Sequence, residues 1–570
     1  MSKQKKVVVV AVLIAVLLVA VLAGLALYKH YAPSREKADV SGLFKLEEDQ
    51  VAILVDDKEQ EERGLIRVGH IYVPVSVASS YMDKRIYVDE TEGILSYVTE
   101  DGLVQASVDA VEYTIGKTKK ETAMSILTKV EDTYYVALDF IKEYASCEYE
   151  MYENPNRLVV MQDRDKKFVT ATVTEKSRLR KGPGKKYAYY TEIAAKDRFF
   201  VETDVKEENE YVAVRTTDGI SGYLPKDRIT EKKEDKWTYE KSPASFTQKG
   251  LDTKVCLGWH QVTNESSAKI LPANIQESGS FNVLCPTWFA LSDNKGGYTS
   301  LANTAYVTQA HSAGYQVWGL INDFGDKLKL STILGTTSIR TKLVNSLVAS
   351  AIQYDLDGLN IDFENVTTDS AAAYLEFLRE LTIKAHANDL VISVDNYTPA
   401  SHNAFYDLEE QGLVVDYVIL MAYDEHYAGS KESGSVSSLG FVSDGVTNML
   451  KQVPAERVVV GLPFFTRLWK EVKTKNGVDV SSAGAYGMSG AESVLSANDA
   501  KKKWDDTTGQ YYAQYKADGA TYKIWLEDEV SLEKKMQTVM KNKVAGVAFW
   551  KLGLERSITW KIIDDALQKE

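Results

Sequence analysis

The sequence predicts a protein of several domains, of which the last and largest is a (β/α)8 barrel with an inserted subdomain. Three observations lead to this fold class. The 570 residues are enough for about three to five domains. Over roughly the last 320 residues, short apolar runs alternate with segments of helical period, which is typical of a parallel sheet covered by helices. No glycine-rich phosphate loop follows the first apolar run, which disfavours an open doubly wound sheet.

The composition excludes some classes of protein. Apolar residues make up 44% and charged residues 26%, as in ordinary globular domains. The net charge of -14 argues against nucleic-acid binding, which requires clustered cations. Cys147, Cys256 and Cys285 lack the spacing of a disulfide framework or a metal site, and the seven histidines form no HExxH-like motif. We therefore expect no metal and no cofactor.

The N-terminus carries a membrane signal. Residues 7–28 are an unbroken apolar run, which meets the requirement of about 20 residues for a membrane-spanning helix. Lysines precede the run, so the positive-inside rule leaves residues 1–6 in the cytoplasm and the rest of the chain outside. The alternative is a signal peptide cleaved near Gly24. Because the run exceeds the usual apolar length of a signal peptide, we expect a single-pass anchor in the cell membrane.

A polar linker over residues 31–50 leads into a predicted domain at residues 51–165. Within it His70–Val77 aligns with Thr133–Phe140, 63 residues later. Each copy is predicted to form a strand, a short helix and a strand pair, without clustered catalytic side chains. This duplicated α+β unit resembles the module in the N-terminal domain of copper amine oxidases, a resemblance that implies a stalk and no copper.

Residues 168–231 are predicted to form a small β-barrel, because short alternating strands are separated there by turn residues. The segments Leu179–Gly184 and Gly219–Leu224 resemble a bacterial SH3-type barrel. The resemblance implies binding of cell-wall peptide or glycan, and a spacer without a ligand is the alternative. A lysine-rich linker follows at residues 232–252.

The barrel is predicted over residues 253–570. Amphipathic segments such as 343–352 place their apolar residues on one helical face. The gap at residues 467–522, between the seventh and eighth strands, is too long for one helix and predicts the inserted subdomain. The eight expected strands are Val255–Trp259, Phe281–Pro286, Val317–Ile321, Leu359–Phe363, Val391–Val394, Tyr417–Met421, Val458–Leu462 and Val547–Trp550.

The fourth strand is unusual because it carries buried polar residues. Side chains alternate between the two faces of a strand, so Leu359, Ile361 and Phe363 are expected to face the helices. Asn360, Asp362 and Glu364 are then expected to face into the barrel. Barrel interiors are normally apolar, and unpaired carboxylates there are costly to desolvate. A solvated edge strand would explain the pattern, but the flanking strands read as buried. We therefore expect the active site at this strand's carboxyl end.

These residues resemble a known signature. The segment Asp357–Glu364 resembles the motif of glycoside hydrolase family 18, the chitinase-like enzymes, with Asp357, Asn360, Asp362 and Glu364 in its four positions. Further matches fall at the expected strand ends: Met421–Asp424, Gly461–Phe464 and Trp550. A closer similarity to bacterial spore-cortex-lytic N-acetylglucosaminidases is indicated by Trp288, Asn322, Trp525 and Glu527.

The resemblance implies substrate-assisted, retaining hydrolysis, in which the substrate's own acetamido group is the nucleophile. Glu364 would be the acid, Asp362 would orient the acetamido group and Tyr423 would bond its carbonyl oxygen. Asp424 would hold the cleaved sugar and Trp550 would lie beneath it. Asp357 and Asn360 are expected to bind substrate because of their positions in the motif. Trp288 and Trp318 are candidate subsites or ordinary core residues.

The expected function is that of a wall-facing glycosidase that cleaves β-1,4 bonds beside N-acetylglucosamine. We expect peptidoglycan, with a chitin-like polymer as the alternative substrate. An inactive, lectin-like binding protein is a further alternative, which the presence of Glu364 disfavours. Asn360 departs from the family's aspartate. We expect its amide to donate to Asp362, its neighbour on the inward face, and to favour the ionised form.

Overall fold

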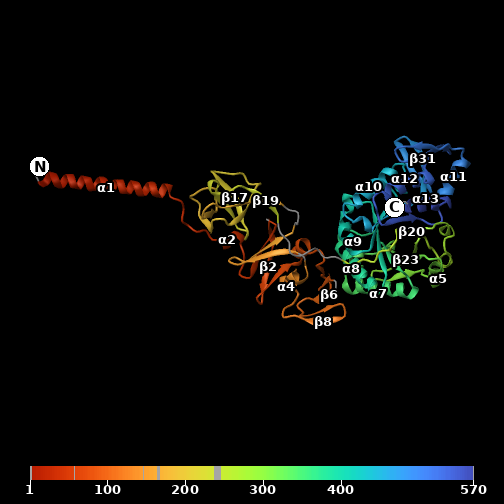
Figure 1. Cartoon of the computed structure of the whole chain (residues 1–570), viewed down its shortest axis with the longest axis horizontal. Coiled ribbons are helices and arrows are strands. Elements are labelled where there is room, and N and C mark those ends of the chain that lie inside the picture. Colours follow the sequence, from red (N-terminus) through yellow and green to blue (C-terminus); the bar gives the residue numbers. More distant parts are fainter. Residues whose placement is uncertain are drawn as a thin grey trace. The chain divides into compact units, whose positions relative to one another are not determined.

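The computed structural model describes residues 3–56, 58–99, 101–145, 147–162, 167–236 and 246–568 (Figure 1). The first two residues of the predicted cytoplasmic tip and residues 237–245 of the predicted linker lie outside these ranges, as do a few positions within or at the ends of other predicted domains. The chain divides into two compact units. One comprises Met1–Ile86, Ala106–Glu112 and Glu121–Ala244, and the other Tyr87–Gln105, Tyr113–Lys120 and Ser245–Glu570.

The chain begins with α1, a helix over Lys3–Tyr31 of 29 residues. By length and composition this helix can cross a membrane, and an N-terminal signal sequence has the same properties. The helix continues a few residues beyond each end of the apolar run. An N-terminal apolar helix is thus present as predicted.

The first unit contains a seven-stranded sheet in the order β11-β12-β1-β2-β3-β10-β9. In it the two copies of the sequence repeat are neighbours, because β3 and β10 pair antiparallel with Val73 opposite Val136. A helix follows each of these strands, α3 over Val75–Val77 and α4 over Leu138–Tyr144. The strands are β1 Gln50–Val55, β2 Lys58–Arg67, β3 His70–Pro74, β9 Leu127–Val130, β10 Thr133–Ala137, β11 Glu148–Tyr152 and β12 Arg157–Met161.

A second seven-stranded sheet of this unit has the order β15-β14-β18-β17-β16-β13-β19. Its apolar core includes Leu179, Phe199, Val214 and Leu224, all buried. The strands are β13 Lys167–Thr172, β14 Ser177–Arg180, β15 Tyr189–Ile193, β16 Arg198–Val201, β17 Tyr211–Thr216, β18 Ser221–Pro225 and β19 Lys233–Lys236.

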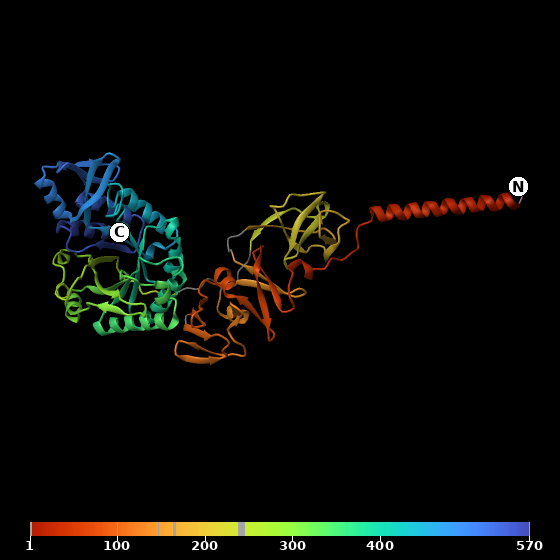
Figure 2. The same ribbon diagram turned by 180° about the vertical axis from the view of Figure 1, so that it is seen from behind.

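The second unit is built on a closed barrel of parallel strands (Figure 2). Each strand pairs in parallel with its neighbours, and the β20–β21 pairing closes the ring. The predicted eight-stranded barrel is confirmed. Its strands are β20 Val255–His260, β21 Val283–Leu291, β23 Gln316–Asn322, β24 Gly358–Asp362, β25 Val391–Tyr397, β26 Tyr417–Met421, β27 Val458–Pro463 and β33 Gly546–Trp550, and β22 Tyr298–Ser300 extends β21 as an antiparallel partner.

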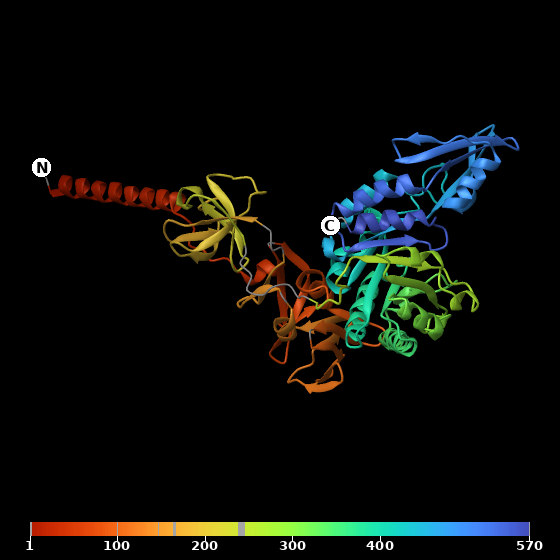
Figure 3. The same cartoon turned by 45° about the vertical axis from the view of Figure 1, so that its right-hand side comes forward.

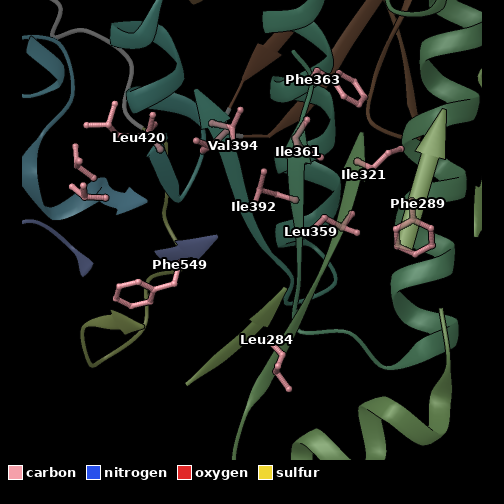
Figure 4. Close-up of a cluster of buried hydrophobic side chains, with 14 of the residues drawn as sticks. Leu284, Phe289, Ile321, Leu359, Ile361, Phe363, Ile392, Val394, Leu420 and Phe549 are labelled. Atoms are coloured by element: carbon pink, nitrogen blue, oxygen red, sulfur yellow. The ribbon is translucent and has the colours of Figure 1, made fainter. Parts of the chain in front are cut away.

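The helices of the barrel pack on the outward-facing apolar side chains of the strands. Leu359, Ile361 and Phe363 belong to this outer core together with residues of the helices, as predicted from strand parity (Figure 4). The larger helices are α5 Thr304–Ser312, α7 Thr337–Tyr354, α8 Ala371–His386, α9 Leu408–Val414, α10 Leu439–Met449, α12 Glu529–Met540 and α13 Ile558–Leu567.

The segment between β27 and α12 forms an antiparallel sheet in the order β29-β28-β32-β31-β30, with α11 over Met488–Ala497 against it. Figure 3 shows these elements in blue as a separate layer. The strands are β28 Phe465–Thr474, β29 Gly477–Gly487, β30 Lys503–Asp505, β31 Gln510–Ala517 and β32 Ala520–Trp525.

The second unit also includes residues 87–105 and 113–120, which the sequence places within the 51–165 domain. The strands β4 Tyr87–Asp89 and β5 Ile94–Thr99 contact α8 of the barrel. The Thr337 N–H at the start of α7 donates to Asp89 Oδ2 at 2.6 Å. These partners are 248 residues apart, so no local sequence pattern indicates their contact.

This contact predicts that Asp89→Ala destabilises the second unit. Asp89 is buried and accepts the backbone N–H groups of Thr91, Glu92 and Thr337, so its loss should cost about 1–3 kcal/mol. In differential scanning calorimetry the transition of the second unit should fall by several degrees. The exposed Glu61→Ala is the control. An unchanged transition of the second unit would refute the assignment of Asp89 to it.

Candidate active site

Strand parity brings two polar rows into the interior of the barrel. On β24, Asn360 is 0% and Asp362 is 7% exposed. The parallel register places Asn360 opposite Ser393 on β25. Because alternate residues share a face, Asp395 lies on the same side of β25 as Ser393. The sheet thus presents neighbouring polar side chains from two strands.

A pocket of about 160 Å³ lies where the carboxyl ends of these strands meet. Five of its lining residues are predicted site residues: Asp362, Glu364, Tyr423, Asp424 and Trp550. The remaining lining residues are Trp259, Leu320, Phe324, Asp395, Tyr397 and Met421. The structure therefore brings the predicted acid Glu364 and its neighbour Asp362 to one cavity with Tyr423 and Asp424.

Glu364 is held in the turn after β24 by Asp323. The backbone N–H groups of Glu364 and Asn365 each donate to the Asp323 carboxylate, both at 3.0 Å. Burial raises the pKa of Glu364, and the negative charges of Asp323 and Asp424 raise it further, while the hydrogen bond from Tyr397 opposes the shift. A carboxyl group with a raised pKa can act as a general acid near neutral pH.

Asp362 has an unsatisfied oxygen. Its Oδ1 is buried and accepts no hydrogen bond from any residue that the structure describes. Burial raises the pKa of Asp362 well above its ordinary value, and the charges of Asp395 and Glu364 add to the shift. Since buried polar groups are nearly always hydrogen-bonded, an unpartnered carboxylate oxygen at a pocket is suited to bind an N–H of a ligand.

Aromatic side chains form one wall of the pocket. The Trp259 ring meets the rings of Tyr423 and Trp550 edge to face, with centroids 6.4 and 6.0 Å apart. Burial raises the pKa of Tyr423 well above its ordinary value, so its hydroxyl remains a hydrogen-bond donor. The wall combines apolar faces, on which sugar rings can stack, with one donor.

The inserted sheet contributes a cation beside the pocket. Arg467 of β28 lies with Nη2 4.0 Å from Asp424 Oδ1 and donates from Nη1 to Ser482 Oγ at 2.9 Å. Asp424 follows Tyr423 with a positive φ of 56°, in the left-handed region. The chain therefore turns sharply at the end of β26, next to the site.

The predicted contact between Asn360 and Asp362 is wrong. The Asn360 Nδ2 group donates to Ser393 Oγ at 2.9 Å and to Asp395 Oδ1 at 2.8 Å. The side chain is fully buried and does not line the pocket, so the predicted substrate contact is also not found. Parity correctly gives the face of Asn360, but a residue on the adjacent strand is closer than the one two positions along its own strand.

Three other predicted substrate residues lie away from the pocket. Asp357 precedes β24, at the opposite end of the strand, where it accepts the Val317 N–H at 2.7 Å. Trp288 is 2% exposed and packs edge to face on Tyr306. Trp318 is fully buried and stacks on Tyr417 in the barrel interior. The two tryptophans follow the core-packing alternative, because their rings fill apolar layers.

Sequence reasoning missed Asp395, Tyr397, Trp259 and Asp323. The expected fifth strand ended at Val394, but β25 continues to Tyr397. Extending the alternation from Ser393 would have placed Asp395 and Tyr397 on the inward face. Among the described residues, no group of three or more histidine, cysteine or carboxylate side chains is arranged to hold a metal ion.

Comparison with known proteins reveals related enzymes. Residues 272–555 match the profile of Glycosyl hydrolases family 18. The cortical fragment-lytic enzyme of Bacillus subtilis is 27% identical over 42% of this chain and 57% of its own length. The uncharacterized glycosylase YvbX of the same species is 25% identical over 50% of this chain and 83% of its own. The crystal structure of the Bacillus cereus spore cortex-lytic enzyme SleL is 20% identical, with a TM-score of 0.49 over 55% of this chain and 74% of its own.

Proposed function

We propose that the protein is a glycoside hydrolase that cleaves β-1,4 bonds beside N-acetylglucosamine in bacterial peptidoglycan, a function supported by the match of residues 272–555 to glycosyl hydrolases family 18 and by the related lytic enzyme of Bacillus subtilis. The observation that carries this proposal is the unpartnered, buried Oδ1 of Asp362 in the same pocket as Glu364. An acetamido N–H is the kind of donor that this oxygen lacks, and Glu364 supplies the proton for a glycosidic oxygen.

In the first step Glu364 gives its proton to the leaving glycosidic oxygen. The acetamido carbonyl oxygen attacks the anomeric carbon as the glycosidic bond breaks, which yields a cyclic oxazolinium ion. Asp362 accepts the acetamido N–H and stabilises the positive charge, and the Tyr423 hydroxyl donates to the carbonyl oxygen. Such preorganised groups act on charge that develops in the transition state.

In the second step the ionised Glu364 takes a proton from water, and the resulting oxygen attacks the anomeric carbon from the side that the leaving group vacated. The oxazolinium ring opens and restores the acetamido group. Two inversions at one carbon give net retention of configuration. Glu364 ends the cycle protonated, ready for the next bond.

Peptidoglycan is favoured as the substrate by three features. The related cortical fragment-lytic enzyme is named for lysis of cortical fragments. The apolar α1 is consistent with an anchor that places the catalytic unit on the wall side of the membrane. The proposed SH3-type domain at residues 168–231 would bind wall material. A chitin-like polymer is the second candidate substrate. An inactive lectin-like role conflicts with the presence of Glu364 in the pocket.

Digestion of purified peptidoglycan tests the function. The products should carry new N-acetylglucosamine reducing ends, identified by mass spectrometry. Glu364→Gln should lower the rate by about 10² or more, because the amide cannot donate the catalytic proton, while glycan binding is retained. Undiminished hydrolysis of fully de-N-acetylated glycan would contradict the substrate-assisted mechanism, and new muramic acid reducing ends would contradict the bond assignment.

Tyr397→Phe tests the environment of the acid. The Tyr397 hydroxyl donates to Glu364 Oε2 and favours its ionised form, so removal of the hydroxyl should raise the pKa of Glu364. Since the first step needs protonated Glu364, the alkaline limb of the kcat/KM profile should move to higher pH, by about one unit. Tyr427→Phe, at an exposed tyrosine outside the pocket lining, is the control. A downward shift would disprove the assigned role of Tyr397.

Protease treatment of intact protoplasts tests the proposed topology. If α1 is an anchor, external protease should degrade the catalytic unit and leave a short membrane-bound N-terminal fragment. Cytoplasmic marker proteins that remain intact provide the control. Recovery of the mature protein in the medium with its N-terminus near Leu27 would instead identify α1 as a cleaved signal peptide.

A further inference from the structure

The mechanism above leaves one buried titratable group of the pocket without a role. Asp395 on β25 is 3% exposed and lines the same pocket as Asp362. The register pairs Asn360 with Ser393 and Ile361 with Val394, so the next pair along the two strands is Asp362 and Asp395. Two carboxyl groups from adjacent strands thus face one cavity at the same level.

The groups that face Asp395 are neutral or acidic. Asn360 donates to it from β24, and the Trp259 ring of β20 lines the same pocket. The titratable groups that interact with it electrostatically are Asp362, Glu364, Cys285, Tyr374 and Tyr423. The described lining of the pocket contains no lysine, arginine or histidine. Two buried carboxylates without a cation repel each other and therefore hold a proton between them.

The amide of Asn360 is oriented by its surroundings. The Trp259 indole N–H can only donate, and it lies 3.2 Å from Asn360 Oδ1. The amide nitrogen must therefore face Ser393 and Asp395. Its hydrogen bond favours the ionised form of Asp395, so in the free enzyme the shared proton resides on Asp362.

We propose that Asp395 is a positioning residue that exchanges one proton with Asp362 during hydrolysis, an inference that rests on the proposed function. As the acetamido oxygen closes on the anomeric carbon, the O–H bond of Asp362 breaks and an O–H bond forms on Asp395. Asp362 then carries the negative charge beside the oxazolinium ion. The proton returns when the ring opens, and no further reactant is consumed.

The titration behaviour of the pair agrees with this geometry. Burial raises the pKa of Asp395 to about 8, with a further contribution from the charge of Glu364 and an opposing one from Asn360. The pKa of Asp362 is also raised, mainly by burial and then by Asp395. The pair therefore titrates as a coupled unit that retains one proton at neutral pH.

The test uses the full-length protein in detergent, without substrate. Infrared difference spectroscopy follows the carbonyl band of protonated carboxyl groups as the pH rises. Asp395→Asn removes the like-charged partner, so the Asp362 band should vanish at least about one pH unit earlier than in the wild type. Asn360→Leu removes the donor to Asp395 but no carboxyl group, so the band should persist to higher pH. The control Ser393→Ala removes the other acceptor of the same amide and should leave the titration unchanged.

The pH dependence of kcat on a chitooligosaccharide provides the second readout. In Asp395→Asn the Asp362 proton has no acceptor, so the rate at pH 5 relative to pH 7 should fall about tenfold further than in the wild type. Spectra and profiles of both variants that superimpose on the wild type would overturn the proposal for Asp395 while leaving the hydrolase function intact. Shifted spectra in a protein that hydrolyses no N-acetylglucosamine polymer would overturn the proposed function instead.

Discussion

The site depends on one constraint, the alternation of side chains along strands of a closed barrel. A closed barrel has no edge, so the polar residues of β24 and β25 must face its interior. Burial there raises the pKa values of Asp362, Glu364 and Asp395. Carboxyl groups that would be fully ionised on a protein surface can thus hold protons near neutral pH, which is the property that acid catalysis requires.

One strand does not build the pocket alone. Tyr423 lies two residues beyond the end of β26, Trp550 ends β33 and Trp259 comes from β20, so strands from around the ring position the donor and the aromatic wall. Asp323 fixes the backbone of Glu364 from the end of β23. The parallel register of the barrel is what converts separated segments of sequence into one cavity.

Much of this arrangement could be predicted from local periodicity. The eight strands and the inward row on β24 follow from alternation, whereas Tyr423, Asp424 and Trp550 were expected only from the resemblance of their segments to glycoside hydrolase family 18. The place of Asp395 in the site was not predicted, because it depends on how far β25 extends and on the register between strands. The apolar layers that bury Trp288 and Trp318, and the distant partner of Asp89, depend on tertiary packing that a single sequence does not display.

Asn360 shows how the barrel accommodates buried charge. A carboxyl group at this position would lie against Asp395 and be the third in this part of the barrel, beside a pocket whose described lining contains no lysine, arginine or histidine. The amide instead satisfies every contact: its oxygen accepts from Trp259 and its nitrogen donates to Ser393 and Asp395. It thereby orients Asp395 without titrating. The second carboxylate of the site is thus provided by the neighbouring strand, at the level where it meets Asp362.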